Sequence, residues 1–132
     1  MFRINRSVIQ AIIAHAGKGL PNEVCGYLAS VNEIVTSYYE LTNIDQAADH
    51  FSMEPREQFA AVKEMRNRGQ VLRAVYHSHP ETPARPSAED IRLAYDPEIS
   101  FVIVSLAATE PEIRSFRVTR GAMAEEAIEI IE

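Results

Sequence analysis

The sequence is poor in cysteine, and this limits the compartments and chemistries that it suits. Its 132 residues contain one cysteine, Cys25. One cysteine cannot form an internal disulfide, so nothing in the sequence indicates an oxidising compartment. We interpret Cys25 as a small buried hydrophobic residue rather than as a reactive thiol.

Long apolar runs and basic clusters are absent as well. No stretch of the sequence approaches the roughly 20 apolar residues that span a bilayer. The first ten residues lack an apolar run followed by a small-residue cleavage site. The formal net charge is −6, and the basic residues are scattered along the chain. We therefore expect a cytoplasmic protein that binds neither membranes nor nucleic acid.

The sequence does contain the composition of one ordinary globular domain. It is 46% hydrophobic, 24% charged and 8% aromatic, which lies within the range of folded proteins. A chain of 132 residues is long enough to bury one core but not two. We therefore predict a single domain over residues 1–132 that carries the whole activity.

Residue patterns predict a mixed α/β domain in which helices alternate with strands, without the regular spacing of a doubly wound fold. Ser7 is the expected N-cap of a first helix, and Pro55 opens a second with an apolar face of Phe59, Val62 and Met65. Expected elements are helices over 7–16, 55–68 and 87–95 and strands over 27–29, 34–41, 71–76, 100–106 and 113–119, with a loop over 43–52. Residues 122–132 fit both a helix and a strand, and we favour a strand.

The candidate catalytic and metal-binding side chains are concentrated in residues 77–90, which read HSHPETPARPSAED. His77 and His79 are two residues apart at the end of a predicted strand that only Arg73 interrupts, so their side chains point to the same side. Such a pair alone is more often structural than ligating. Asp90 adds a third candidate ligand, and two histidines with one carboxylate leave an open position on tetrahedral zinc, as catalysis requires.

A zinc site of this kind needs further groups from elsewhere in the chain. Zinc lowers the pKa of a bound water from about 15.7 toward about 7. The sequence lacks the His-Glu-x-x-His spacing that supplies a nearby base, so a general base must come from another segment. Ser87 and Asp90 form a capping-box pattern, which starts a helix without any chemistry. A serine at that position can also donate to a developing oxyanion.

Residues 77–90 resemble the motif of the JAMM (MPN-plus) zinc metalloproteases, in which His-x-His-Pro is followed by a serine, with seven residues between the second histidine and that serine, and then by x-x-Asp. Residues 21–30, PNEVCGYLAS, resemble the segment that carries the family's upstream glutamate, with Glu23 in that place. The resemblance runs from residue 5 to about residue 120. It implies a central, mostly antiparallel sheet flanked by helices, in an arrangement like that of the cytidine deaminases.

The resemblance also implies a role for each matched residue. His77, His79 and Asp90 would hold one zinc ion per chain. Glu23 would be the general base that takes a proton from water and later protonates the leaving amine, and Ser87 would help to hold the oxyanion. His15 and His50, which match no motif position, are expected to be ordinary histidines rather than ligands.

The short chain resembles the compact, stand-alone prokaryotic branch of this family, which implies a substrate class. Members of that branch act on the C-terminal tail of ubiquitin-like sulfur-carrier proteins, or remove an amino acid or peptide joined to it. Such a tail is extended and binds readily along a strand edge, with residues 43–52 and 81–85 as candidate contacts.

Such a peptidase has three alternatives. A zinc amidase for small peptides and a non-catalytic MPN scaffold remain open, although scaffold members usually lack part of the metal set. A zinc deaminase is excluded, because its Pro-Cys-x-x-Cys signature needs two cysteines. The oligomeric state does not follow from the sequence.

Overall fold

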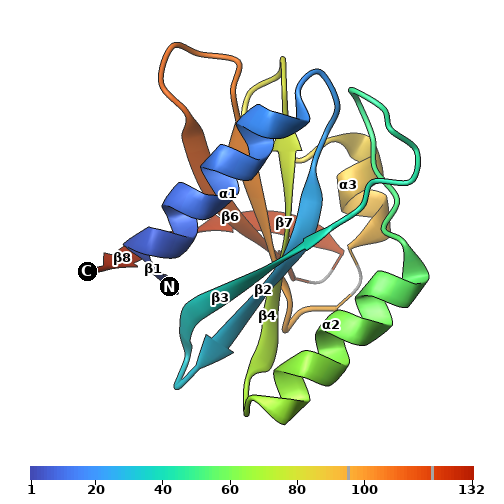
Figure 1. The fold of residues 1–132 in the computed structure, drawn as a ribbon. Helices are drawn as coiled ribbons and strands as arrows, with labels where there is room; N and C mark the ends of the chain where they lie inside the picture. The colour runs from blue at the N-terminus through green and yellow to red at the C-terminus, as the bar shows by residue number, and fades with distance from the viewer. Residues whose placement is uncertain (95, 120) are drawn as a thin grey trace.

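A computed structural model of the chain describes residues 1–94, 96–119 and 121–132, so the predicted helix end at Tyr95 lies outside the described residues. Figure 1 shows the helices lying against a strongly curved sheet. The elements are β1 (Phe2–Asn5), α1 (Arg6–Gly19), β2 (Cys25–Val31), β3 (Ile34–Leu41), α2 (Pro55–Asn67), β4 (Val71–His79), α3 (Ala88–Leu93), β5 (Ser100–Ser105), β6 (Glu112–Thr119), β7 (Ala122–Glu126) and β8 (Ile128–Ile131).

The strands form one sheet with the order β7-β6-β5-β4-β2-β3-β1-β8. Antiparallel pairing joins β7 to β6, β6 to β5, β4 to β2 and β2 to β3. Parallel pairing joins β5 to β4, β3 to β1 and β1 to β8. The predicted mixed and mostly antiparallel sheet is confirmed, and β4 lies in its middle.

The last residues of the chain join the two ends of this sheet. Only Ala127 separates β7, which pairs with β6, from β8, which pairs with β1. The backbone N–H of Phe2 donates to the carbonyl of Ala127 over 2.8 Å. The predicted strand over residues 122–132 is therefore confirmed, and it is divided between the two outermost positions of the sheet.

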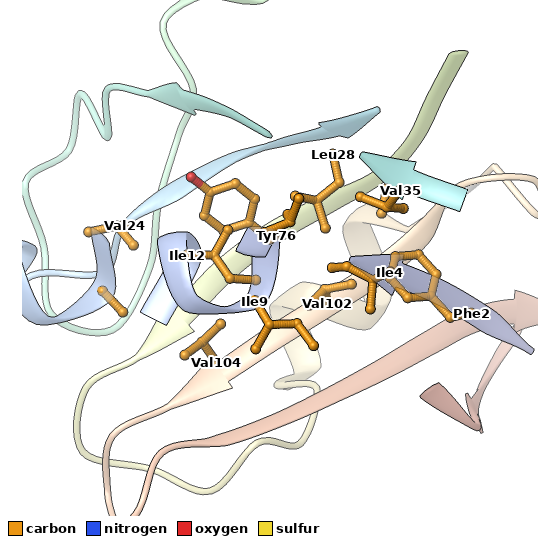
Figure 2. Close-up of a cluster of buried hydrophobic side chains, with 13 residues drawn as sticks. Phe2, Ile4, Ile9, Ile12, Val24, Leu28, Val35, Tyr76, Val102 and Val104 are labelled. Atoms are coloured by element: carbon orange, nitrogen blue, oxygen red, sulfur yellow. The ribbon is translucent and has the colours of Figure 1, made fainter. Parts of the chain in front are cut away.

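Helix α1 covers one face of the sheet and begins differently from the prediction. Its buried residues Ile9 and Ile12 pack against Tyr76 of β4, as Figure 2 shows. The predicted cap at Ser7 is wrong, because Asn5 is still paired with Ile131 in the sheet and the helix starts directly after it, at Arg6. The N-terminal strand, which the sequence patterns missed, thus sets the start of the helix.

Helix α2 covers the opposite face, where Ala61 and Met65 pack against Cys25 and its neighbours in β2. Cys25 is completely buried, as predicted. The prediction that Phe59 faces the core is wrong, since its side chain is 73% exposed. Ala61 and Met65 are four residues apart and define the buried stripe, and Phe59 projects from the other side of the helix.

Among the described residues no helix is both long enough and apolar enough to cross a membrane.

Candidate metal centre

Strand β4 carries both candidate histidines on the face that α2 covers. Side chains alternate along a strand, and Tyr76 points into the core under α1, so His77 and His79 point to the other face. Gly26, which pairs with Tyr76, must be a glycine because a Cβ there would lie 2.4 Å from the tyrosine ring. Both histidines are buried. The strand runs to His79, beyond the predicted end at residue 76.

Asp90 is held in place by the predicted capping box. The Ser87 hydroxyl accepts a hydrogen bond from the Asp90 backbone N–H over 3.0 Å. The Ser87 backbone N–H in turn donates to Asp90 Oδ2 over 2.8 Å. These two bonds fix the carboxylate at the start of α3, so the cap serves the site as well as the helix.

The three candidate ligand atoms converge. His77 Nε2 lies 3.1 Å from His79 Nε2, and Asp90 Oδ2 lies 3.3 Å from each of them. Tetrahedral zinc with bonds of about 2.0–2.1 Å separates its nitrogen and oxygen ligands by about 3.3–3.4 Å. The donor set and its spacing therefore fit a zinc ion.

The surroundings of the two imidazoles differ, and only those of His79 assign its Nδ1 as the donor. His79 Nδ1 lies 2.9 Å from the carbonyl oxygen of Pro83, which accepts its proton and leaves Nε2 free to act as a ligand. The His77 ring stacks on Phe51 with centroids 4.8 Å apart. His77 Nδ1 is buried and has no partner among the described residues.

The electrostatics of the cluster favour a cation. Burial raises the pKa of Asp90, but its hydrogen bonds with His77 and His79 outweigh this and hold the pKa well below its usual range. Burial lowers the pKa of His79, but the hydrogen bonds with Asp90 and the Pro83 carbonyl raise it further than burial lowers it. Asp90 therefore stays an anionic carboxylate that faces the two imidazoles, and this arrangement attracts a cation.

Glu23 lies beside this cluster because of the strand register. β2 and β4 are antiparallel with Cys25 opposite His77, and the Ser78 N–H donates to the Val24 carbonyl over 3.0 Å. Continuing the register places Glu23 opposite His79 on the same face of the sheet. The Glu23 side chain is 6% exposed, and burial raises its pKa to about 7, although the His79 charge acts in the opposite direction.

Asn43 holds the backbone of Glu23, a role that the sequence reasoning missed. Its side-chain amide donates to the carbonyls of Glu23 and His50 over 3.0 and 3.1 Å. Its Oδ1 accepts from the N–H groups of Asp45 and Ser52, both over 3.1 Å. Asn43 therefore ties the predicted loop over residues 43–52 to the site. A lone asparagine in a polar loop gives no sequence signal of this role.

The two other histidines have partners outside the ligand cluster. His50 Nδ1 lies 2.8 Å from Asp49 Oδ1, and its Nε2 lies 3.5 Å from Asp45 Oδ2. His15 Nδ1 lies 2.8 Å from the Tyr76 hydroxyl. The metal-type cluster found among the described residues consists of His77, His79 and Asp90.

Known sequences place the chain in a family. Residues 5–119 match the prokaryotic homologues of the JAB domain, so the chain belongs to this family. It is 31% identical over 132 residues to the CysO-cysteine peptidase of Mycobacterium tuberculosis, covering 98% of this chain and 90% of that one. It is 32% identical over 104 residues to the desampylase of Haloferax volcanii, covering 72% of this chain and 73% of that one.

A solved structure supports the same fold. The solution structure of a protein from Desulfitobacterium hafniense matches with a TM-score of 0.90 and 45% identity, over 100% of this chain and 94% of that one. The predicted JAMM/MPN family and fold are confirmed. With named peptidases among its relatives, the chain is a hydrolase of the JAMM type.

Proposed function

We propose that this chain is a zinc peptidase that hydrolyses the amide bond at the C-terminal tail of a ubiquitin-like sulfur-carrier protein. The observation that carries the proposal is the convergence of His77, His79 and Asp90 to 3.1–3.3 Å, with Glu23 buried across the strand pair from His79. The names of the relatives, a CysO-cysteine peptidase and a desampylase, support the substrate class.

His77 Nε2, His79 Nε2 and Asp90 Oδ2 would hold the metal, and imidazole with carboxylate is a donor set that suits zinc. Bound there, zinc would supply Lewis-acid chemistry that acidifies a water and polarises the scissile carbonyl. The Pro83 carbonyl and the Ser87 N–H keep two of the three ligand groups oriented.

Glu23 supplies the proton transfers. Its carboxylate takes a proton from the attacking water while the water oxygen bonds to the scissile carbon. It then passes that proton to the leaving nitrogen as the carbon–nitrogen bond breaks, which yields a carboxylate and an amine. A carboxyl with a pKa near 7 can both accept and return a proton at neutral pH.

Ser87 assists at the carbonyl oxygen. Its hydroxyl oxygen already accepts a hydrogen bond from the Asp90 backbone, so the hydroxyl proton remains available for donation. Directed at the substrate, that proton stabilises the charge that develops on the carbonyl oxygen. Ser87 therefore has a structural and a chemical role in the same position.

Metal analysis of the protein purified without added metal tests the proposal. We expect about one zinc per chain, lost in His77→Ala and retained in His50→Ala, which removes an exposed histidine outside the cluster. Cleavage of a carrier fusion should follow the metal content. A His77→Ala protein that keeps its zinc and its turnover would refute the assignment.

Two substrates measured side by side separate this function from its alternatives. Carrier-linked amides should be cleaved and free dipeptides should not. Equal turnover of both would favour a small-peptide amidase. Zinc binding with no hydrolysis of either would favour a scaffold.

A further inference from the structure

The loop over residues 43–52 is attached to helix α2 at both of its ends. It connects β3 to α2 and lies beside α3 (Figure 1). Just before the loop, the Thr42 backbone N–H and hydroxyl donate to the Glu57 carboxylate over 2.6 and 2.8 Å. Just after it, the Gln58 amide contacts the Met53 sulfur at 3.6 Å. A loop that is anchored on both sides can hold other groups in place.

The strand register sets the side on which Glu23 lies, and this loop holds the Glu23 backbone. The paired residues of β2 and β4 begin with Cys25 and His77, two positions beyond Glu23. The Glu23 N–H donates to the Ala47 carbonyl over 2.8 Å, and the Glu23 carbonyl accepts from the Asn43 amide over 3.0 Å. Both backbone hydrogen-bonding groups of the proposed base are therefore bound to the loop.

Asn43 joins the Glu23 backbone to the rest of the loop through a side chain that is only 9% exposed. Its Oδ1 accepts from the N–H groups of Asp45 and Ser52, which lie within the loop. Its Nδ2 donates to the carbonyls of Glu23 and His50. The two ends of the amide thus have different tasks, because Oδ1 shapes the loop and Nδ2 attaches Glu23 to it.

Phe51, in the same loop, lies against a candidate metal ligand. Its ring stacks on the His77 ring with an interplanar angle of 28° and centroids 4.8 Å apart. Metal-bound histidines usually donate their second ring N–H to an acceptor, as His79 does to the Pro83 carbonyl. His77 Nδ1 is buried and has no hydrogen-bond partner among the described residues. The stacked ring of Phe51 is therefore the group that orients His77.

We propose that the loop over residues 43–52 positions the catalytic groups, with Asn43 setting the backbone of the Glu23 base and Phe51 setting the ring of the ligand His77. The inference rests on the proposed peptidase function and deepens it. The mechanism gives neither Asn43 nor Phe51 a contact with the reacting atoms, so both are positioning residues. The two tasks use different side chains and different contacts. Substitutions should therefore separate them.

Asn43→Asp tests the first task with a carrier fusion as substrate. It keeps an acceptor for Asp45 and Ser52 but loses the donor to the Glu23 carbonyl. We expect kcat to fall about 10- to 100-fold, because a displaced base transfers protons poorly, while KM and zinc affinity stay near those of the parent protein. Asn22→Asp makes the same change beside Glu23, at a side chain without a hydrogen bond to a described residue, and should keep kcat within about threefold.

A double-mutant cycle shows whether Asn43 acts through the base. In the Glu23→Gln background, Asn43→Asp should have almost no further effect on kcat, because the group that Asn43 positions has already been removed. Asn43→Ser, which adds no charge, is the second variant and should give the same loss of kcat and the same result in the cycle. A full additional loss in the Glu23→Gln background, or an unchanged kcat in both Asn43 variants, would overturn the first task.

Phe51→Leu tests the second task through metal affinity. The substitution keeps an apolar side chain but removes the ring that stacks on His77. In competition with a chromophoric chelator, we expect zinc to bind about tenfold more weakly, with kcat at saturating zinc within about threefold of the parent protein. Phe51→Tyr, which retains the ring, should restore the affinity. Equal zinc affinity in Phe51→Leu and the parent protein would remove the second task.

These measurements separate failure of the inference from failure of the proposed function. Zinc affinity is measured without substrate, so the comparison at Phe51 holds even for a protein that cleaves nothing. A parent protein that binds zinc but cleaves neither carrier conjugates nor peptides would refute the peptidase, and with it the role of Asn43. A peptidase whose kcat and zinc affinity do not change with either substitution would keep its function and refute the positioning role of the loop.

Discussion

Two largely buried polar clusters lie toward the two ends of β4, and they balance their charge differently. At one end His77, His79 and Asp90 meet at 3.1–3.3 Å. Toward the other end Arg73 donates to Ser100 over 2.7 Å and lies 3.9 Å from the carboxylate of Glu126.

The difference lies in where the positive charge comes from. Arg73 is permanently charged, so its cluster is balanced by the protein alone. Ser100 and Ser115 also donate to Glu126, and Arg73 lies over the Phe2 ring at 5.0 Å, which links strands from both ends of the sheet order. The histidine cluster contains no permanent cation. A cluster of buried polar groups that includes an arginine can therefore stabilise the fold by itself. A similar cluster without a permanent cation suits the binding of a metal ion.

The largest expected effect tests the chemistry beside the histidine cluster. Glu23→Gln should lower kcat about 10²- to 10⁴-fold, because the amide cannot accept the proton. Zinc content should stay near one per chain, since Glu23 is outside the ligand cluster. Glu33→Gln, which makes the same change at the hairpin turn, is the matched control. Turnover within a few fold of the parent protein would rule out Glu23 as the base.

The next effect concerns the stability of the arginine cluster, and the zinc content should not change. Arg73→Met removes the charge that balances Glu126, and an uncompensated buried carboxylate costs about 3 kcal/mol of unfolding free energy. Denaturant unfolding measures the loss, and metal analysis should find unchanged zinc. If zinc and stability fall together, the two ends of β4 are not independent.

A pH series on the metal-free protein measures how much the burial of Glu23 contributes to the free energy of unfolding. In the folded protein burial raises the pKa of Glu23 to about 7, above the 4.5 of an exposed glutamate. The stability linked to this proton is therefore fully present below pH 4.5 and is lost as the pH rises through about 7. Relative to Glu23→Gln, the chelator-treated parent protein should lose about 2–3 kcal/mol between pH 4.5 and 8.

Denaturant unfolding of both proteins at several pH values makes this measurement. Glu33→Gln should follow the parent protein, because that side chain is exposed at a turn. An identical pH profile for Glu23→Gln and the parent protein would mean that the Glu23 carboxyl is not desolvated.

The smallest effect separates the two roles of Ser87. Ser87→Ala removes the side-chain acceptor at the N-cap of α3 and should cost about 1 kcal/mol of stability. It should also lower kcat by about tenfold or more through the lost donor. Ser87→Asp restores an acceptor but no hydroxyl proton, so it should recover stability and not turnover. Recovery of both would assign Ser87 to the cap alone.

Much of the fold could be predicted because its patterns are local. The hairpin of β2 and β3, the start of α2 at Pro55 and the antiparallel pair β5 and β6 all agree with the predicted segments. The errors have a common cause. The start of α1 and the exposure of Phe59 depend on which surfaces the sheet covers, and a residue pattern within one helix does not contain that information.

The sequence by itself determined the candidate ligand set and its local geometry. His77 and His79 share a face because side chains alternate along a strand, and Ser87 and Asp90 meet because they are three residues apart at a helix start. Both local arrangements form regardless of where the two segments lie in the folded protein.

Only the tertiary structure decided what surrounds that set. The β2–β4 register places Glu23 beside His79. The loop over residues 43–52 brings Asn43 to the Glu23 backbone and Phe51 to the His77 ring. Arg73 lies near Glu126 because the end of the chain joins the sheet. These contacts join residues that are far apart in sequence. Their geometry depends on strand pairing and packing across the whole core, which no local pattern encodes.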